Sequence, residues 1–228
     1  MEELFQGVRI RVNDKLFVKD PESSTLGKSI VEISIVMMGE LGFEKFNFRK
    51  LGERIGSNES SIYRYFENKH KLLLYLTSWY WGWMEYQLVF ATHNIAEPKE
   101  KLSKAIYMIT REIKEDSNFS HINEVLLNNI VINEYSKSYL TKEVDEEDKE
   151  GFFASYKRLA KRLSDMIRVF DPKYKYPSSL ASTILGGALH QHFLKNHFSS
   201  LTECNDKVTP TEYLTNLVFN VLNQNFND

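Results

Sequence analysis

The sequence predicts an all-α protein made of a small N-terminal helical domain and a C-terminal helical bundle. Apolar residues recur every three or four positions along most of the 228 residues, the spacing of a helix that buries one face. Glycine and proline number only 10 and 5, fewer than a turn-rich β protein needs. Four of the prolines stand where a helical pattern begins: Pro21, Pro98, Pro177 and Pro210.

The composition limits the class of protein. Hydrophobic residues make up 42% of the chain, which is enough for a core, but no run of about 18 apolar residues predicts a membrane span. The first residues lack the basic start and apolar centre of a signal peptide. The single Cys204 has no partner for an internal disulfide, as is usual in a reducing compartment. We therefore expect a cytoplasmic protein that makes no contact with a membrane.

Residues 1–26 form an extension ahead of the first long helix. Residues 8–12 alternate apolar and basic side chains, a second short run covers residues 15–18, and an Asn-Asp pair separates the two. This pattern predicts a short β-hairpin. The alternative is an extension without regular structure. A lone hairpin is marginal in water, so we expect it to pack on the helices that follow.

Residues 27–75 predict three helices, of which the second and third are short. The first runs to about Gly39 and ends by Gly42. Asn47 can cap the second helix and Asn58 the third, with Gly56 as the left-handed stop between them. Apolar stripes give each helix one buried side, whereas Glu59, Ser60, Tyr63 and Arg64 share the other side of the third. Two helices joined by such a turn form a helix-turn-helix, whose second helix enters the DNA major groove.

The same residues resemble the N-terminal domain of the TetR family of bacterial transcriptional regulators. The corner at residues 40–43, Glu-Leu-Gly-Phe, is similar to the family's acidic-x-Gly-aromatic corner. Residues 56–66 are similar to its turn and recognition helix, and residues 68–73 to the start of its fourth helix. The resemblance implies an N-terminal DNA-binding domain. It also implies that residues 76–228 form a ligand-binding domain that dimerises through its last two long helices.

The expected DNA contacts come from helix N-termini, polar side chains and cations, because these suit phosphate oxygens and base edges. Glu59 departs from the family pattern, and it either accepts a hydrogen bond from cytosine or merely favours the helix N-terminus. Arg9, Arg11 and Lys15 of the extension either reach DNA or, as we favour, support packing. The predicted contacts are Asn47, Arg49, Asn58, Glu59, Ser60, Ser61, Tyr63, Arg64 and Lys69.

Beyond residue 75, helical patterns cover about residues 69–90, 98–116, 121–137, 149–170, 177–197 and 210–226. Aromatic residues could line a pocket for an apolar or aromatic effector, although plain core is the alternative: Trp79, Trp83, Tyr86, Tyr107 and Phe153. Small residues in the helix at 177–197 permit close helix packing, which suits a dimer interface. Its expected members are Leu185, Gly186, Leu189, His190, Phe193 and Leu217.

The resemblance to the TetR family implies a ligand-responsive repressor that binds a palindromic operator on double-stranded DNA as a homodimer. We expect no cofactor and no metal site, since the histidines at positions 190, 192 and 197 lack partners at ligand spacing. We also expect no enzyme, because no catalytic set stands out. The alternative is a helical lipid-binding or hydrophobe-binding protein of the same fold that has lost DNA binding, which Glu59 and the near-neutral first domain motivate.

Overall fold

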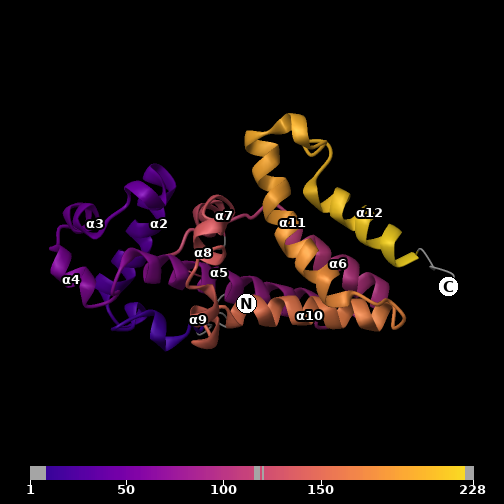
Figure 1. Cartoon of the computed structure of the whole chain (residues 1–228), viewed down its shortest axis with the longest axis horizontal. Coiled ribbons are helices and arrows are strands. Elements are labelled where there is room, and N and C mark those ends of the chain that lie inside the picture. Colours follow the sequence, from indigo (N-terminus) through magenta and orange to yellow (C-terminus); the bar gives the residue numbers. More distant parts are fainter. Residues whose placement is uncertain (1–8, 116–118, 120, 224–228) are drawn as a thin grey trace. The chain divides into compact units, whose positions relative to one another are not determined.

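All regular structure in the described residues is helical, which confirms the all-α prediction (Figure 1). The computed structural model describes residues 9–115, 119 and 121–223, and no strand occurs among them. None of the helices in these ranges is long and apolar enough to cross a membrane. The α-helices are α2 (Thr25–Lys45), α3 (Phe48–Ile55), α4 (Glu59–Tyr63), α5 (Lys69–Thr92), α6 (Pro98–Thr110), α7 (Glu124–Asn133), α8 (Tyr135–Tyr139), α9 (Val144–Lys149), α10 (Ala154–Phe170), α11 (Pro177–His197) and α12 (Pro210–Asn223).

The predicted β-hairpin is wrong for the part of it that the structure describes, residues 9–18. The Asn13 side chain accepts a hydrogen bond from the Lys15 N–H and so caps a 3-10 turn, η1 (Asp14–Leu16), in place of a hairpin turn. Ile10 and Leu16 are buried in the protein rather than paired across two strands. The apolar side chains thus reflect packing on helices, and Val8 lies outside the described residues.

Three other predicted helices are shorter or divided in the structure. The expected helix at 98–116 ends at Thr110, because the backbone of Arg111 is extended. The expected helix at 149–170 begins only at Ala154, because Gly151 has a φ of 83°, a left-handed conformation that interrupts the helix. The expected helix at 121–137 divides at Glu134, where the backbone leaves the helical region. Irregular backbone at these points separates α7, α8, α9 and α10.

The chain divides into two compact units. Unit 1 comprises Met1–Gly82 and Ile113–Ser155, and unit 2 comprises Trp83–Glu112 and Tyr156–Asp228. Helix α5 therefore contributes its first part to unit 1 and its second part to unit 2. The predicted functional domains, 1–26, 27–75 and 76–228, were drawn from motifs rather than from compactness, and they stay predictions.

Unit 1 joins the first helices to the segment that carries α7, α8 and α9. His121 Nε2 lies 2.7 Å from a carboxylate oxygen of Glu22, and His70 Nε2 lies 2.7 Å from one of Glu147. The carboxylate of Glu134 accepts a hydrogen bond of 2.9 Å from the buried N–H of Phe43, at the end of α2. These long-range contacts explain why residues 113–155 belong with the N-terminal helices.

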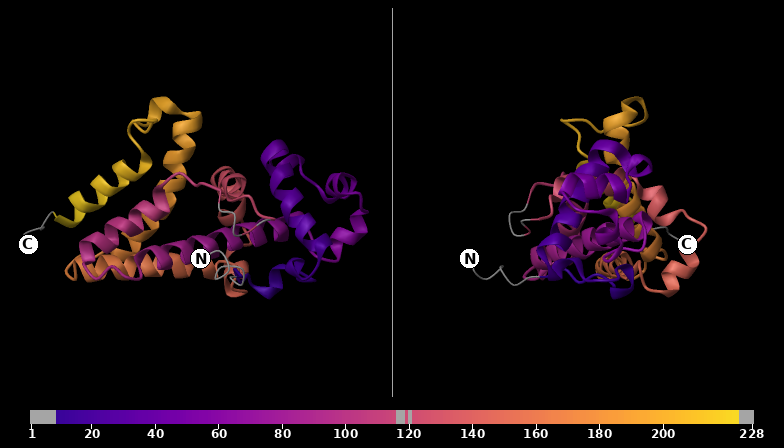
Figure 2. Two further views of the ribbon diagram at one scale, coloured as in Figure 1. Left: turned by 180° about the vertical axis from the view of Figure 1, so that it is seen from behind. Right: turned by 90° about the vertical axis from the view of Figure 1, so that its left-hand side faces the viewer.

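Unit 2 is a group of helices in which α11 and α12 form a hairpin turned by residues 198–209 (Figures 1 and 2). Both helices also contact α6. Thr110 Oγ1 of α6 lies 2.9 Å from Thr211 Oγ1 of α12, and the Thr110 carbonyl oxygen lies 2.9 Å from His192 Nε2 of α11. The second part of α5 is tied to α10 by Glu85, whose buried carboxylate receives Arg158 and Arg162 at 2.9 and 2.7 Å.

Candidate nucleic-acid interface and ligand cleft

The helix-turn-helix is built by side-chain caps, as its sequence predicts. The Asn47 side chain accepts a hydrogen bond from the Lys50 N–H at 2.9 Å and begins α3. Gly56 ends α3 in the left-handed region, with φ 68° and ψ 31°. Asn58 Oδ1 then accepts the Ser61 N–H at 2.8 Å and both neighbouring serine hydroxyls, at 2.7 and 2.8 Å. The turn and the start of α4 are therefore fixed by local contacts.

Helix α4 presents a polar side to solvent. Ile62 is fully buried on the opposite side, which anchors the helix in unit 1. Tyr63 is 48% exposed; its ring packs edge-on against Phe48, and its hydroxyl lies 3.3 Å from a carboxylate oxygen of Glu59. Arg64 is exposed and makes no ion pair with Glu67 or with any other described residue. Its guanidinium is thus available to an external anion.

Most other cations near α4 are engaged within unit 1. Arg49 pairs with Glu53 at 3.2 Å on the surface, a contact of little strength. Arg54 pairs with Glu40 through both terminal nitrogens. Lys69 donates to the carbonyls of residues 43, 44 and 46 at 2.9, 3.1 and 3.3 Å. A phosphate contact from Lys69 would have to replace one of these bonds, so its predicted role in DNA binding competes with a role in holding the α2–α3 corner.

The N-terminal extension packs against the end of α4. The Val18 N–H donates to the Tyr65 carbonyl at 2.8 Å, and the Tyr65 hydroxyl lies 2.7 Å from Ser24 Oγ. The hydrogen bond between the Tyr65 hydroxyl and Ser24 lowers the pKa of Tyr65. The Lys19 ammonium, 5.1 Å from the centroid of the Tyr65 ring, lowers this pKa further. Arg9 and Lys15 are paired with Asp20 and Glu150. These contacts favour the packing role over DNA contact for those two residues.

The aromatic residues predicted to line a pocket fall in both units. In unit 1, Trp79 packs edge-on against Phe119, and Phe153 packs on Tyr139, at ring separations of 5.2 and 5.3 Å. In unit 2, Trp83 is buried and Tyr86 stacks on a neighbour one helical turn away. Tyr107 is 47% exposed, with the Lys104 ammonium 5.2 Å from its ring. The contacts within each unit are those of ordinary core and surface packing, and the pocket assignment stays a prediction.

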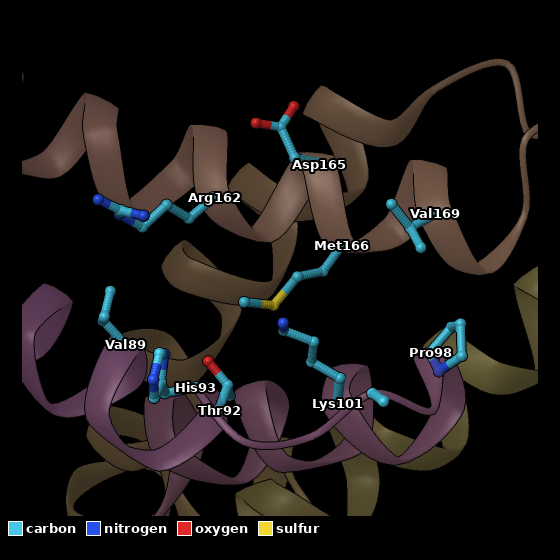
Figure 3. Close-up of a pocket in the computed structure, with 10 residues that line it drawn as sticks. Val89, Thr92, His93, Pro98, Lys101, Arg162, Asp165, Met166 and Val169 are labelled. Carbon is cyan, nitrogen blue, oxygen red and sulfur yellow. The ribbon is translucent and has the colours of Figure 1, made fainter.

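Unit 2 contains a cleft that the sequence did not reveal. Its volume is about 400 Å³, within the range of small-molecule sites. One wall comes from residues 89–101, at the end of α5 and the start of α6, and the other from residues 162–169 of α10 (Figure 3). The walls are more than sixty positions apart in the sequence, so no local pattern could have located the cleft.

The predicted dimer residues differ in exposure. Leu185 and Leu189 are buried inside unit 2, whereas His190 is exposed. Gly186, Phe193 and Leu217 are half-buried, and the Phe193 ring also contacts His197 and Phe198. A second copy of the chain could therefore contact His190, Gly186, Phe193 and Leu217, but not the buried Leu185 and Leu189. In the described part of the chain, no group of three or more His, Cys, Asp or Glu side chains is arranged to hold a metal ion.

Comparison with known proteins gives a family and a fold. Residues 30–76 match the family model described as bacterial regulatory proteins, tetR family. The match covers α2 from residue 30 onward, the helix-turn-helix and the start of α5, the same part of the chain whose caps are described above. No curated protein matches the sequence.

Several solved structures share the fold at low sequence identity. AibR, in complex with isovaleryl coenzyme A and operator DNA, is 17% identical over 86% of this chain and 97% of its own, with a TM-score of 0.55. The regulator PfmR from Thermus thermophilus is 15% identical over 85% and 97%, with a TM-score of 0.52. The superantigen PfiT is 14% identical over 91% and 100%, with a TM-score of 0.60. Identities this low establish the common fold and nothing about activity.

Proposed function

Because this chain belongs to the TetR family of bacterial transcriptional regulators, we propose that it is a repressor whose affinity for DNA changes when it binds a small molecule. The observation that carries the proposal is helix α4, which is capped by Asn58, anchored by Ile62 and open to solvent along its polar side. In this proposal residues 27–75 bind DNA in the cytoplasm and residues 76–228 bind the effector and a second copy.

The proposed DNA contacts divide into phosphate and base contacts. The N-termini of α3 and α4 offer backbone N–H groups beside Asn47 and Asn58, a geometry that suits phosphate oxygens. Arg64 is the strongest candidate for a base or phosphate contact, because its guanidinium has no partner among the described residues. Glu59 would then accept a hydrogen bond from a cytosine amino group.

A homodimer would present two copies of α4 to a palindromic site. Recognition helices of helix-turn-helix dimers enter successive major grooves about 34–36 Å apart. The exposed and half-buried residues of α11 and α12, such as His190 and Phe193, form the surface proposed for the second copy. AibR, which shares the fold, has been crystallised with both an acyl coenzyme A and operator DNA, and this supports a protein of this fold that combines the two ligands.

The alternative is a ligand-binding protein of the same fold that does not bind DNA. The exposed carboxylate of Glu59 on α4 favours it, because a negative charge beside phosphates weakens binding. The similarity to a superantigen also indicates that this fold serves other functions. DNA binding is therefore the property to test first.

The test is selection of bound fragments from random DNA by the purified full chain, followed by titration at several salt concentrations. The proposal expects an enriched inverted repeat and an affinity that falls steeply with salt, because phosphate contacts release counterions. Sedimentation of the complex should give two chains per site. If no sequence is enriched and the affinity for DNA stays negligible at low salt, the alternative is correct.

A further inference from the structure

The cleft of unit 2 has an unusual combination of apolar walls and unpaired positive charge. In Figure 3 the Lys101 side chain extends from one wall of the cleft and the Met166 side chain extends from the other, and the two point toward each other. Val89 and Val169 complete the apolar part, and both are exposed, at 39% and 65%. Single exposed valines are ordinary on a protein surface, but these two line the same cleft as the Lys101 ammonium.

Lys101 has no internal partner for its charge. The residue is half-buried, and its ammonium makes no ion pair or hydrogen bond with any of the described residues. Two other lysines of unit 2, by contrast, are paired: Lys161 with Asp165 at 2.8 Å, and Lys195 with Glu112 at 2.8 Å. A cation that is partly removed from water and left without a counter-charge is best stabilised by an anion that enters the cleft.

Arg162 adds a second positive group at the rim of the cleft. Its Nε donates to Glu85 at 2.7 Å, but Glu85 also receives Arg158 at 2.9 Å, so one carboxylate is shared by two guanidiniums. The single negative charge of Glu85 therefore cannot fully neutralise Arg162, because it also serves Arg158. The two terminal nitrogens of Arg162 donate to none of the described residues, which leaves them free for an external acceptor.

The acidic residue among those that line the cleft, Asp165, does not cancel this charge. Its carboxylate points away from Lys101 and Met166 in Figure 3. It is already paired with Lys161 at 2.8 Å and with Arg168 at 3.4 Å. The carboxylate of Glu97, which precedes α6, is likewise engaged, since it accepts the Lys99 N–H at 3.1 Å as the helix cap.

We propose that this cleft binds a small organic acid whose carboxylate lies between Lys101 and Arg162 and whose aliphatic chain lies against Met166 and the two valines. A carboxylate fits because both cations can donate charge-assisted hydrogen bonds to its oxygens. An aliphatic chain fits because the flexible thioether of methionine adapts to irregular apolar partners. In naming this acid as the effector, the inference rests on the proposed regulatory function; the binding site itself stands independently of DNA binding.

The test is isothermal titration of the full chain with sodium octanoate, with 1-octanol and octylamine as probes of equal chain length. Octanoate should bind saturably at one site per chain. The alcohol and the amine should bind at least about tenfold more weakly, because a hydrogen bond to a charged group is worth about 1.5–3 kcal/mol and 1.4 kcal/mol is tenfold. Sodium acetate should also bind at least tenfold more weakly, since it lacks the chain that fills the apolar walls.

Two matched variants identify the cation. Lys101→Met keeps the length of the side chain and removes its charge, so it should weaken octanoate binding at least about tenfold and leave 1-octanol binding unchanged. Lys104→Met, on the same helix, removes an ammonium that lies over Tyr107 and does not line the cleft, and it should bind octanoate as the parent does. Circular dichroism spectra of both variants should match that of the parent.

The inference is overturned if no octanoate binding is detected, if octanol binds as tightly as octanoate, or if the two lysine variants behave alike. DNA binding is measured separately on the same protein, so the two proposals fail separately. A chain that binds DNA but not octanoate contradicts only the inference, and one that binds octanoate through Lys101 but never binds DNA contradicts only the regulatory function.

Discussion

Glu134 should be one of the most important side chains for the stability of unit 1. Its side chain is only 10% exposed; one oxygen accepts the buried N–H of Phe43 at 2.9 Å, and the other pairs with Lys137 at 2.9 Å. The hydrogen bond to Glu134 is the largest cause of the raised pKa of Lys137, and the exposed Glu44 adds a smaller contribution. Lys137 therefore joins a buried and an exposed carboxylate, which allows a matched comparison.

Replacement Glu134→Ala removes the acceptor of a buried backbone N–H, which costs about 1–3 kcal/mol. Lys137 keeps Glu44 at 3.1 Å, so the loss of its ion pair adds little. We expect a loss of about 2–3 kcal/mol in the free energy of unfolding. Glu134→Gln, whose amide oxygen can still accept the N–H, should lose about half as much.

The assay is urea denaturation followed by circular dichroism and by tryptophan fluorescence, whose transitions must coincide before a free energy is extracted. Glu44→Ala serves as the control, because it removes the exposed carboxylate from the same lysine and should cause no measurable change. Equal stability of the Glu134→Ala and Glu44→Ala proteins would show that the hydrogen bond from the buried Phe43 N–H does not make Glu134 important for stability.

Two further predictions concern packing and pH. A Cβ at Gly82 would lie 2.7 Å from Ile10 Cγ2, so Gly82→Ala should lower the free energy of unfolding by about 1–2 kcal/mol, as overpacking does. A Cβ added at Gly39 would have no such neighbour within 4 Å, so Gly39→Ala should raise the free energy of unfolding by about 1 kcal/mol in the same urea titration. If both substitutions lowered the free energy of unfolding, the space around the two glycines would not explain their effects. Lys195, through its hydrogen bond, lowers the pKa of Glu112 below 4.5, so the pair stabilises the protein above that pH and the stabilisation is lost as the pH falls through the lowered pKa. Because Glu112 is 67% exposed, the difference between parent and Glu112→Gln should stay below about 1 kcal/mol at pH 7 and should shrink as the carboxylate is protonated at acidic pH; a difference that does not shrink on acidification would exclude this cause.

The sequence predicted what local contacts determine. Asn47, Gly56 and Asn58 act on their own neighbours within four residues, so their roles follow from the sequence alone. The prediction of a β-hairpin was wrong because Asn13 can cap a 3-10 turn as readily as it can enter a hairpin turn. Only the burial of Ile10 and Leu16 distinguishes these two structures.

The remainder depends on contacts between distant residues. Lys69 looks like a phosphate ligand in the sequence, yet its ammonium holds three carbonyls of the α2–α3 corner about 25 positions earlier in the chain. The cleft joins Lys101 to Arg162, and nothing near either residue in the sequence marks it as part of a site. Local motifs thus identified the proposed DNA-binding surface, whereas the cleft was found only in the folded chain.

We propose that this chain binds DNA through the exposed side of α4, and a comparison of two arginines can test this claim. Fluorescence anisotropy should be measured with a selected DNA fragment at several salt concentrations for the parent, Arg64→Ala and Arg54→Ala. Arg64→Ala should lose about 1–3 kcal/mol of binding free energy. Arg54→Ala, whose guanidinium is engaged by Glu40, should bind DNA with nearly the affinity of the parent. Equal affinities for the parent and the Arg64→Ala protein, or no salt-dependent binding by the parent, would contradict the claim.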